Sequence, residues 1–478
     1  MEYETVIGLE VHAELSTATK IYCSCKNAFG AEVNTECCPI CTGMPGTLPT
    51  LNKKVVEYAV RMGCALHCGI NLVSKQDRKN YFYPDLPKAY QISQFDVPLC
   101  ERGYVDVLMD GREKRVGVTR IHIEEDAGKL LHGESFSGTL VDFNRCGVPL
   151  IEIVSEPDMR SSAEAKAYLE TITSILQCLG ISDCKMQEGS VRCDVNVSVR
   201  PVGSEKFGTR CEMKNVNSFN GTARAIDYES ARQIKLIEAG GTVEQETRRW
   251  DDAKGMSFPM RSKEDAQDYR YFPEPDLGTI VLTQEFVDGI RDSIPELPNK
   301  RTVRYMRDYG LTEFDANLIA LSGEKTEFFE RCVAAGSVQP KNIANWLNGD
   351  VTYILNGKGT SLESSQLTPE KLVSLVGLIE KGTISNTAGK TVLEEIFASG
   401  GEPDDIVKAK GLAQVNGGAQ LEEAVKAVLE QNEKSVADYK RGKTNALGFL
   451  VGQCMRATKG KGNPKAIHDM LISELEKA

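Results

Sequence analysis

The sequence predicts an α+β protein with an N-terminal, mainly antiparallel β-sheet. This sheet forms a cradle domain with flanking helices, and a helical domain and a small all-α tail domain follow it. Several segments before about residue 293 alternate apolar and polar side chains with the period of half-buried strands. Segments after that point follow helical patterns rich in Ala, Leu, Val, Glu and Lys. A chain of 478 residues is also too long to fold around one ordinary hydrophobic core, so we expect more than one domain.

The composition limits the class of protein. An apolar content of 41% and a charged content of 26% are typical of a soluble globular chain. No run of about 18 apolar residues predicts a membrane span, and the N-terminus lacks the pattern of a signal peptide, so we expect a cytoplasmic protein. The net charge of −11 argues against sequence-blind nucleic-acid binding by the whole chain, and we expect neither DNA nor a membrane as partner.

Turn-forming segments place the expected boundaries. The Pro-rich stretch 294–298 and the Gly-rich stretch 400–405 interrupt the surrounding patterns. We therefore predict domains at 1–293, 294–404 and 405–478. Within the first domain, Ser161–Gly180 is the clearest helix, because Ser161 can cap it, Glu164 completes a capping box and Gly180 ends it.

The first segment with candidate chemistry is the strand Val6–His12. Alternation places Glu10 and His12 on one face and the apolar side chains on the other. A carboxylate and an imidazole on one face could both contact a metal ion. An amphipathic strand with a solvated polar face explains the same pattern.

The second segment is Thr119–Lys129, in which Arg120, His122 and Glu124 alternate with isoleucines. Glu125, Asp126 and Lys129 follow in a turn. Carboxylate oxygens are the ligands that Mg²⁺ prefers, and Arg120 or Lys129 could neutralise phosphate charge.

Further polar faces follow along the chain: Asn144, Arg145 and Glu152 in 141–158; Arg192, Asp194 and Asn196 in 190–200; and Arg210, Glu212 and Lys214 in 210–217. Several such faces in one domain suggest a sheet that lines a charged cavity, as expected for phosphoryl transfer. The sequence contains no GxxxxGK[ST] and no kinase Gly-rich loop, so any ATP binds by another architecture.

Two aromatic segments are candidate ligand loops. Lys79–Tyr90 contains two prolines and three tyrosines, and Tyr269–Asp276 has the same character. Tyrosines can stack on bases, and Lys79 and Lys88 can contact phosphates. A structural loop packed by Pro and Tyr explains these segments equally well.

Most of the 15 cysteines are scattered singly among apolar neighbours and are expected to be buried thiols. The exception is the loop 23–41, with Cys23, Cys25, Cys38 and Cys41, and with Cys37 in addition. Two close pairs on a short loop are the layout of a four-cysteine Zn²⁺ site that clamps a loop. Four reduced thiols without metal are the alternative.

The C-terminal segment 440–467 contains only basic charges. These are Lys440, Arg441, Lys443, Arg456, Lys459, Lys461 and Lys465. Clustered Lys and Arg without acids predict phosphate contacts, whereas an incidental basic patch on a solvated helical domain is the alternative.

Together the motifs closely resemble the GatB family. The strings that carry the resemblance are IGLEVH, CPICTGMPG, RKNYFYPDLPKAYQIS, HIEEDAGK, DFNRCGVPLIEIV, VRCDVNVSVR, RCEMKNVNSF and DYRYFPEPDL. The resemblance covers nearly the whole chain and is densest up to about residue 277. The stretch 440–464 resembles the YqeY-like tail of that family.

The resemblance implies the B subunit of the bacterial glutamyl-tRNA(Gln)/aspartyl-tRNA(Asn) amidotransferase, an ATP-dependent carbon–nitrogen ligase with glutamine as amido donor. Such a subunit uses ATP and Mg²⁺ to phosphorylate the side-chain carboxylate of the amino acid on mischarged tRNA. An amidase A subunit supplies ammonia through a polar channel, and a small C subunit completes the heterotrimer. Accordingly, this sequence has no Ser-rich amidase stretch with its lysine.

The resemblance also implies roles for individual residues. Around magnesium it implies Glu10, His12, Glu125 and Glu152. Near the nucleotide or the tRNA 3′ end it implies Lys79, Tyr83, Asp85 and Lys88, with Arg120, Glu124, Lys129 and Asn144 as further cofactor-binding candidates. Lining the pocket it implies Arg192, Asp194, Asn196 and Lys214. Some members of the family lack the cysteines, which favours a structural role for zinc, and Cys37 beside Cys38 could shift a ligand by one position.

Two other functions fit parts of the sequence. A non-catalytic tRNA-binding scaffold would rely on the basic tail, but it needs no buried acids. A free-standing ATP-dependent ligase would be active without a partner.

Overall fold

The computed structural model describes residues 1–132, 138–262, 268–414, 419–441, 443, 445–458 and 462–477. Its contacts divide the chain into two compact units, Met1–Arg301 and Thr302–Ala478. The three-domain division with boundaries at 293 and 404 stays a prediction.

Unit 1 is built on a nine-stranded sheet with the order β14-β13-β12-β11-β1-β10-β7-β6-β2. Its strands are β1 (Tyr3–Glu14), β2 (Gly69–Ile70), β6 (Cys100–Met109), β7 (Arg112–Glu125), β10 (Pro149–Ser155), β11 (Val191–Pro201), β12 (Cys211–Val216), β13 (Glu246–Asp251) and β14 (Met256–Ser262). All neighbouring pairs are antiparallel except β12 with β13. The expected mainly antiparallel sheet is therefore confirmed.

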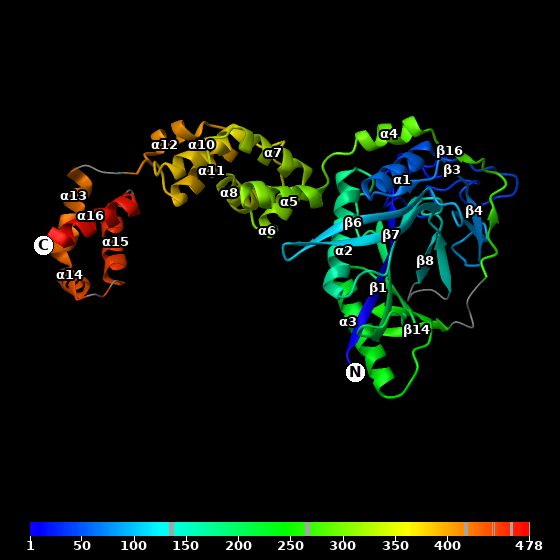
Figure 1. Ribbon diagram of the computed structural model, residues 1–478. Helices are drawn as coiled ribbons and strands as arrows, with labels where there is room; N and C mark the ends of the chain where they lie inside the picture. Colours follow the sequence, from blue (N-terminus) through cyan, green and yellow to red (C-terminus); the bar gives the residue numbers. More distant parts are fainter. Residues whose placement is uncertain are drawn as a thin grey trace. The chain divides into compact units, whose positions relative to one another are not determined.

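One face of this sheet is apolar and carries the helices α1 (Lys53–Ala65), α2 (Ser162–Cys178) and α3 (Phe219–Glu238). Alternation along the strands supplies the sheet's half of the core, with Leu9 and Val195 fully buried. The predicted start of α2 is confirmed, because the Ser161 hydroxyl accepts the Glu164 N–H at 3.2 Å. In Figure 1, α2 and α3 lie along one side of the sheet, and β8 lies on the other.

Short strands extend this unit. They form the sheets β15 (Phe272–Pro273) with β4 (Asp77–Asn80) and β5 (Tyr90–Ser93); β16 (Ile280–Val281) with β3 (Val73–Ser74); and β8 (Lys129–His132) with β9 (Thr139–Asp142). The candidate loop at 79–90 thus begins in β4 and ends at β5. The helix α4 (Gln284–Asp292) follows them and packs against α1.

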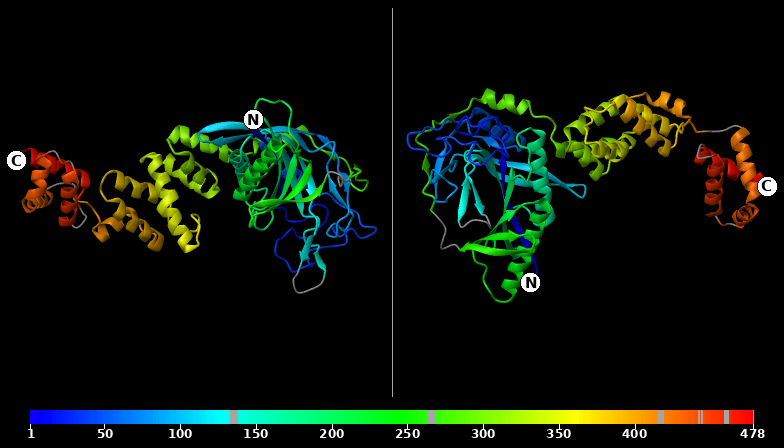
Figure 2. Two further views of the ribbon diagram at one scale, coloured as in Figure 1. Left: turned by 90° about the horizontal axis from the view of Figure 1, so that it is seen from below. Right: turned by 180° about the vertical axis from the view of Figure 1, so that it is seen from behind.

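The described part of unit 2 contains helices and no strand (Figures 1 and 2). After α5 (Pro298–Tyr309), which crosses the boundary, come α6 (Glu313–Ala320), α7 (Gly323–Ala334), α8 (Pro340–Trp346), η2 (Leu347–Val351), α9 (Thr352–Lys358), α10 (Pro369–Glu380), α11 (Asn386–Ser399), α12 (Pro403–Lys410), α13 (Ala419–Gln431), α14 (Glu433–Lys440), α15 (Asn445–Ala457) and α16 (Pro464–Lys477). The buried apolar residues form two separate cores, one over residues 305–407 and one over residues 421–475. No helix in the described residues has the length and apolarity needed to span a membrane.

Candidate functional site

A row of ionisable side chains crosses the centre of the large sheet on the face opposite the helices. The register places His12 of β1 directly beside Glu152 of β10, and Glu152 beside His122 of β7. Directly paired residues of antiparallel strands project to the same side. Three strands that are far apart in sequence therefore bring these groups together, with Glu124 two residues beyond His122.

The distances make this row a candidate metal site. The His12 Nε2 atom lies 3.4 Å from Glu152 and 3.7 Å from Glu124. One ligand atom each of His12, Glu124 and Glu152 lies within 4.8 Å of the others. The His122 Nε2 atom lies 3.2 Å from Glu152, behind these three groups. The donor set of two carboxylates and one imidazole suits a small divalent cation.

The charges of the row balance only when its histidines are protonated. Burial lowers the pKa of His12, but the hydrogen bond and charge of Glu152 and the charge of Glu124 raise it to about 9 overall. Burial raises the pKa of Glu152, but the charge of His122 and the hydrogen bond of His12 hold it well below its usual range. Buried carboxylates that require protonated histidines as counterions would be satisfied equally by a cation.

A second group of acids lies beside the row, towards β12. One ligand atom each of Glu10, Asp194 and Glu212 lies within 4.8 Å of the others. The Lys214 ammonium lies 2.9 Å from Glu212 and forms an ion pair with Asp194. The Asn196 amide donates to Glu10 at 2.9 Å. Burial, followed by the charge of Glu152, raises the pKa of Glu10.

The predicted residues Arg192, Asp194, Asn196 and Lys214 thus all lie on the polar face, around Glu10 and His12. Arg192 reaches Asp126 at 2.7 Å, and Arg145 lies 3.3 Å from the same carboxylate. These pairs form the end of the polar face next to the turn after β7.

Lys79 lies among aromatic rings near the row. Its Nζ atom is 4.9 Å from the ring centre of Tyr269 and 5.9 Å from that of Tyr81. The Lys79 side chain makes no hydrogen bond or ion pair with any residue that the structure describes. Burial lowers the pKa of Lys79, but the charge of Glu124 and the tyrosines raises it overall. A charged ammonium without an anionic partner is suited to bind an anionic ligand.

The structure separates Glu125 from the row. Glu124 and Glu125 are neighbours on β7, so their side chains project to opposite faces of the strand. The Glu125 carboxylate forms a buried ion pair with Lys88 and accepts the N–H of Ile92 at 3.0 Å. The group that the structure brings to His12 and Glu152 is Glu124, whereas the predicted ligand Glu125 lies with Lys88.

The remaining predicted residues lie elsewhere. Asn144 binds the cysteine loop, because its side chain accepts the N–H of Glu36 at 2.8 Å and donates to the carbonyl of Glu32 at 2.7 Å. This geometry explains Asn144 without a nucleotide. Tyr83 and Lys129 are exposed, Asp85 is half-buried beside the turn at Gly128, and the Arg120 Nε atom is buried without a hydrogen-bond partner among the described residues.

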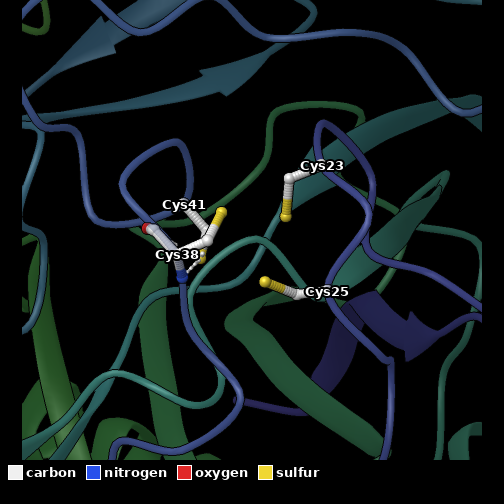
Figure 3. Close-up of side chains that lie close together, drawn as sticks. All are labelled: Cys23, Cys25, Cys38 and Cys41. Atoms are coloured by element: carbon white, nitrogen blue, oxygen red, sulfur yellow. Dashed lines mark hydrogen bonds between the residues drawn. The ribbon is translucent and has the colours of Figure 1, made fainter.

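The four predicted cysteines converge. Figure 3 shows Cys23 and Cys25 on one loop facing Cys38 and Cys41 on another, with the sulfur atoms turned towards one another. The four sulfurs lie within 4.8 Å of one another. Cys37 is not part of the group, because its thiol donates to the carbonyl of Asn34. The predicted ligand set needs no shift of register.

The surroundings of the cluster stabilise the thiolate form of Cys41. A hydrogen bond from Cys23, together with the backbone N–H of Cys38 and the charge of Lys20, lowers the pKa of Cys41 to about 5 against the effect of burial. The fully buried Lys20 ammonium lies 3.9 Å from the Cys41 sulfur. Four sulfurs at this spacing with a stabilised thiolate fit a tetrahedral Zn²⁺ ion.

In the tail, the basic residues that the structure describes are exposed: Lys440, Arg441, Lys443, Arg456 and Lys465. Lys459 and Lys461 lie outside the described residues. Lys443 lies 3.2 Å from Asp438, so one of these charges is partly neutralised.

Sequence reasoning misses two members of the site. The alternation places His122 and Glu212 on polar faces but assigns neither a role. The signal for His122 is its alternation with Arg120 and Glu124, whereas the pairing of Glu212 with Glu10 and Asp194 depends on the order of β1, β11 and β12.

Comparisons with known proteins show which families and relatives this chain is similar to. The family described as the GatB/GatE catalytic domain matches residues 5–288, and the family described as the GatB domain, of the YqeY type, matches residues 327–475. The B subunit of the aspartyl/glutamyl-tRNA(Asn/Gln) amidotransferase from Caldicellulosiruptor bescii is 58% identical over 480 residues, and the match covers 100% of both chains. The B subunits of the same name from Thermoanaerobacter pseudethanolicus and Clostridium botulinum are 57% and 52% identical, again over 100% of both chains.

Proposed function

This chain belongs to the GatB family of amidotransferase B subunits, and from that premise we propose that its unit 1 activates a carboxylate carried on tRNA. The substrates would be glutamyl-tRNA(Gln) and aspartyl-tRNA(Asn), as the names of its relatives imply. The products would be glutaminyl-tRNA(Gln) and asparaginyl-tRNA(Asn). The reaction would be that of an ATP-dependent carbon–nitrogen ligase with glutamine as amido donor.

The chemistry requires two steps. Ammonia cannot displace an oxide from a carboxylate, so a carboxylate oxygen first attacks the γ-phosphorus of ATP and ADP leaves. Ammonia then attacks the carbonyl carbon of the acyl phosphate, and inorganic phosphate leaves with the bonding electrons. Both steps bring anions together, so positioning and cationic groups provide most of the catalysis.

The observation that supports this proposal most directly is the buried row of His12, Glu124 and Glu152. These residues would hold Mg²⁺, which when bound would neutralise phosphate charge and orient the transferred group. His122 would orient Glu152 through its 3.2 Å contact. A non-catalytic scaffold has no need of such buried acids.

Basic residues of the same face would receive the anionic substrates. Lys79 has no anionic partner among the described residues and would contact a phosphate. Arg192 and Lys214 are held by Asp126 and Asp194, so they would offset charge while staying in fixed positions.

The remaining features fit a multi-subunit enzyme. Ammonia would come from an amidase A subunit, with a small C subunit completing the heterotrimer, in the cytoplasm where tRNA is charged. The exposed basic residues of the tail would contact the tRNA body. The four cysteines would bind a structural Zn²⁺ ion, since four thiolates leave no open position for catalysis.

The test is ATP cleavage by the chain co-purified with its partner subunits, with and without glutamyl-tRNA(Gln). We expect cleavage that depends on the charged tRNA and is lost in His12→Ala, while glutamine hydrolysis by the partner stays measurable. Full transamidation by His12→Ala would remove the row from the active site. If the chain without its partner subunits were as active as the complex, even after free ammonia is removed, this would instead indicate a free-standing ligase.

A further inference from the structure

The segment 268–276 runs beside β4 and contributes two tyrosines to the surroundings of Lys79. We call it the tyrosine strap. Its end forms β15, where Phe272 pairs with Arg78 and Pro273 with Asp77. The Asn80 N–H donates to the carbonyl of Tyr269 at 3.0 Å. Backbone pairing thus places the strap along the whole of β4.

The strap has a strained conformation at its centre. Arg270 has a φ angle of 45°, in the left-handed region that a non-glycine residue rarely adopts. The bend lies between Tyr269, whose ring lies beside Lys79, and Tyr271, whose ring stacks on Phe95 at 4.3 Å. The two tyrosine rings meet edge to face, with their centres 6.0 Å apart. Strain of this kind persists only where surrounding contacts determine the conformation.

Arg78 supplies the strongest of those contacts. Its guanidinium donates to both oxygens of Glu274, at 2.6 and 2.8 Å. The Glu274 side chain is 0% exposed and the Arg78 side chain 20%. The guanidinium also lies over the Tyr90 ring at 4.1 Å. A bidentate and stacked guanidinium fixes both distance and orientation, which a lysine cannot do.

Strand alternation connects this clamp to the site. Arg78 and Lys79 are neighbours on β4, so Arg78 holds the strap from one face while Lys79 projects from the other. The Lys79 ammonium is surrounded by rings that the strap and the adjoining loop provide. The position of the Tyr269 ring therefore depends on the clamp.

We propose that Arg78 is a positioning residue that clamps the tyrosine strap through Glu274 and so holds Lys79 and its tyrosines ready for an adenosine that carries phosphate. This inference rests on the proposed function. Two substrates of that reaction share this chemistry, ATP and the 3′-terminal adenosine of the tRNA. Without the clamp, the rings leave Lys79, the ammonium becomes mobile, and ligand binding weakens more than the chemical step.

The chain offers a matched control in a second clamp of the same kind. Arg232 donates to both oxygens of Glu229 at 2.9 and 2.6 Å, with side-chain exposures of 23% and 0%. This pair lies on α3, which covers the opposite face of the large sheet. Arg232→Gln and Arg78→Gln each remove one bidentate Arg–Glu pair, but only Arg78→Gln touches the strap. Glu229 keeps contacts with Gln233 and Arg248 in Arg232→Gln.

The experiment compares Arg78→Gln, Arg78→Lys and Arg232→Gln in the complete enzyme with its partner subunits. The measurements are the KM for ATP, the KM for glutamyl-tRNA(Gln), kcat and the melting temperature. We expect both Arg78 variants to raise one KM by about tenfold with a much smaller change in kcat. Arg232→Gln should lose similar thermal stability and keep both KM values. Arg78→Lys keeps the positive charge but cannot make the bidentate contact with Glu274. It therefore provides the test if Arg78→Gln does not fold.

The pattern of the result assigns the ligand. A raised KM for ATP places the nucleotide at the strap, and a raised KM for tRNA places its terminal adenosine there. Arg78 variants that match Arg232→Gln in both KM values, or that lower only kcat, would overturn the inference while the proposed function stands. Absence of tRNA-dependent ATP cleavage in the unmodified enzyme would overturn the proposed function, and the inference with it.

Discussion

Glu124 and Glu125 are adjacent acids whose replacement by glutamine should have opposite consequences. Glu125 forms a buried pair with Lys88, and their side chains are 3% and 10% exposed. Glu124 lies 3.7 Å from His12 and 3.8 Å from His122, so both of its ion pairs are longer than a direct hydrogen bond. Glu125 therefore contributes to the stability of unit 1, and Glu124 to the site.

The magnitudes follow from these contacts. Removing one partner of a buried ion pair typically costs about 3–5 kcal/mol. Glu125→Gln can still accept the Ile92 N–H, so we expect the lower end of that range. The unfolding entropy is about 2.1 cal/mol/K per residue, summed over unit 1. Dividing a loss of about 3–5 kcal/mol by this entropy gives a melting temperature lower by roughly 5–8 °C. Glu124→Gln keeps the size of the side chain and loses contacts of 3.7 and 3.8 Å, so it should cost less stability than Glu125→Gln.

ATP cleavage should show the reverse order, with a larger loss in Glu124→Gln than in Glu125→Gln. Residues that support a metal ligand typically affect affinity or activity by about 10–100-fold, so loss of the Glu124 carboxylate itself should reduce tRNA-dependent ATP cleavage by more than about 100-fold. Glu125→Gln should keep most of the activity at temperatures where it is folded.

Calorimetric melting and the ATP assay, on the same preparations, check both expectations. Normal ATP cleavage by Glu124→Gln would remove this carboxylate from the site. An inactive Glu125→Gln that melts like the unmodified protein would place Glu125 in the site instead.

Three further predictions concern the cysteine loop and the tail. Cys38→Ser should lose the bound zinc and several kcal/mol of stability, because metal binding contributes to folding. Cys37→Ser should keep both the zinc and the stability. Metal analysis and thermal melting distinguish the two variants, and a metal-free unmodified protein would favour plain thiols. Asn144→Ala removes two hydrogen bonds to the loop and should cost about 1–3 kcal/mol without raising the KM for ATP, and a raised KM would return Asn144 to the nucleotide site. Deletion of residues 419–478 should weaken tRNA binding and flatten its salt dependence; an affinity unchanged across a salt series would refute the role of the tail.

The sequence predicts most of the local structure of unit 1. The alternation at Val6–His12 and at 190–200 identifies β1 and β11 and assigns their polar faces correctly. The spacing of the four cysteines predicts a cluster that the structure forms, without Cys37. Alternation also places Glu124 with His122, although the predicted metal set contains Glu125 instead.

Long-range pairing could not be predicted from local patterns. Nothing in the segment around Asn144 indicates that its amide binds a loop more than 100 residues earlier. The clamp of Arg78 on Glu274 joins residues 196 positions apart, and either residue alone resembles an ordinary surface charge.

The sequence by itself determined the family, the mainly antiparallel sheet and the face that each side chain takes on its strand. These follow from local geometry, because successive side chains of a strand alternate whatever its neighbours are. The tertiary structure decided which strands are neighbours and in what register, so that His12, Glu152 and His122 form one row and Glu125 is buried with Lys88. Register and strand order depend on packing between distant segments against α1, α2 and α3, and the pattern within any one segment contains no information about its partner.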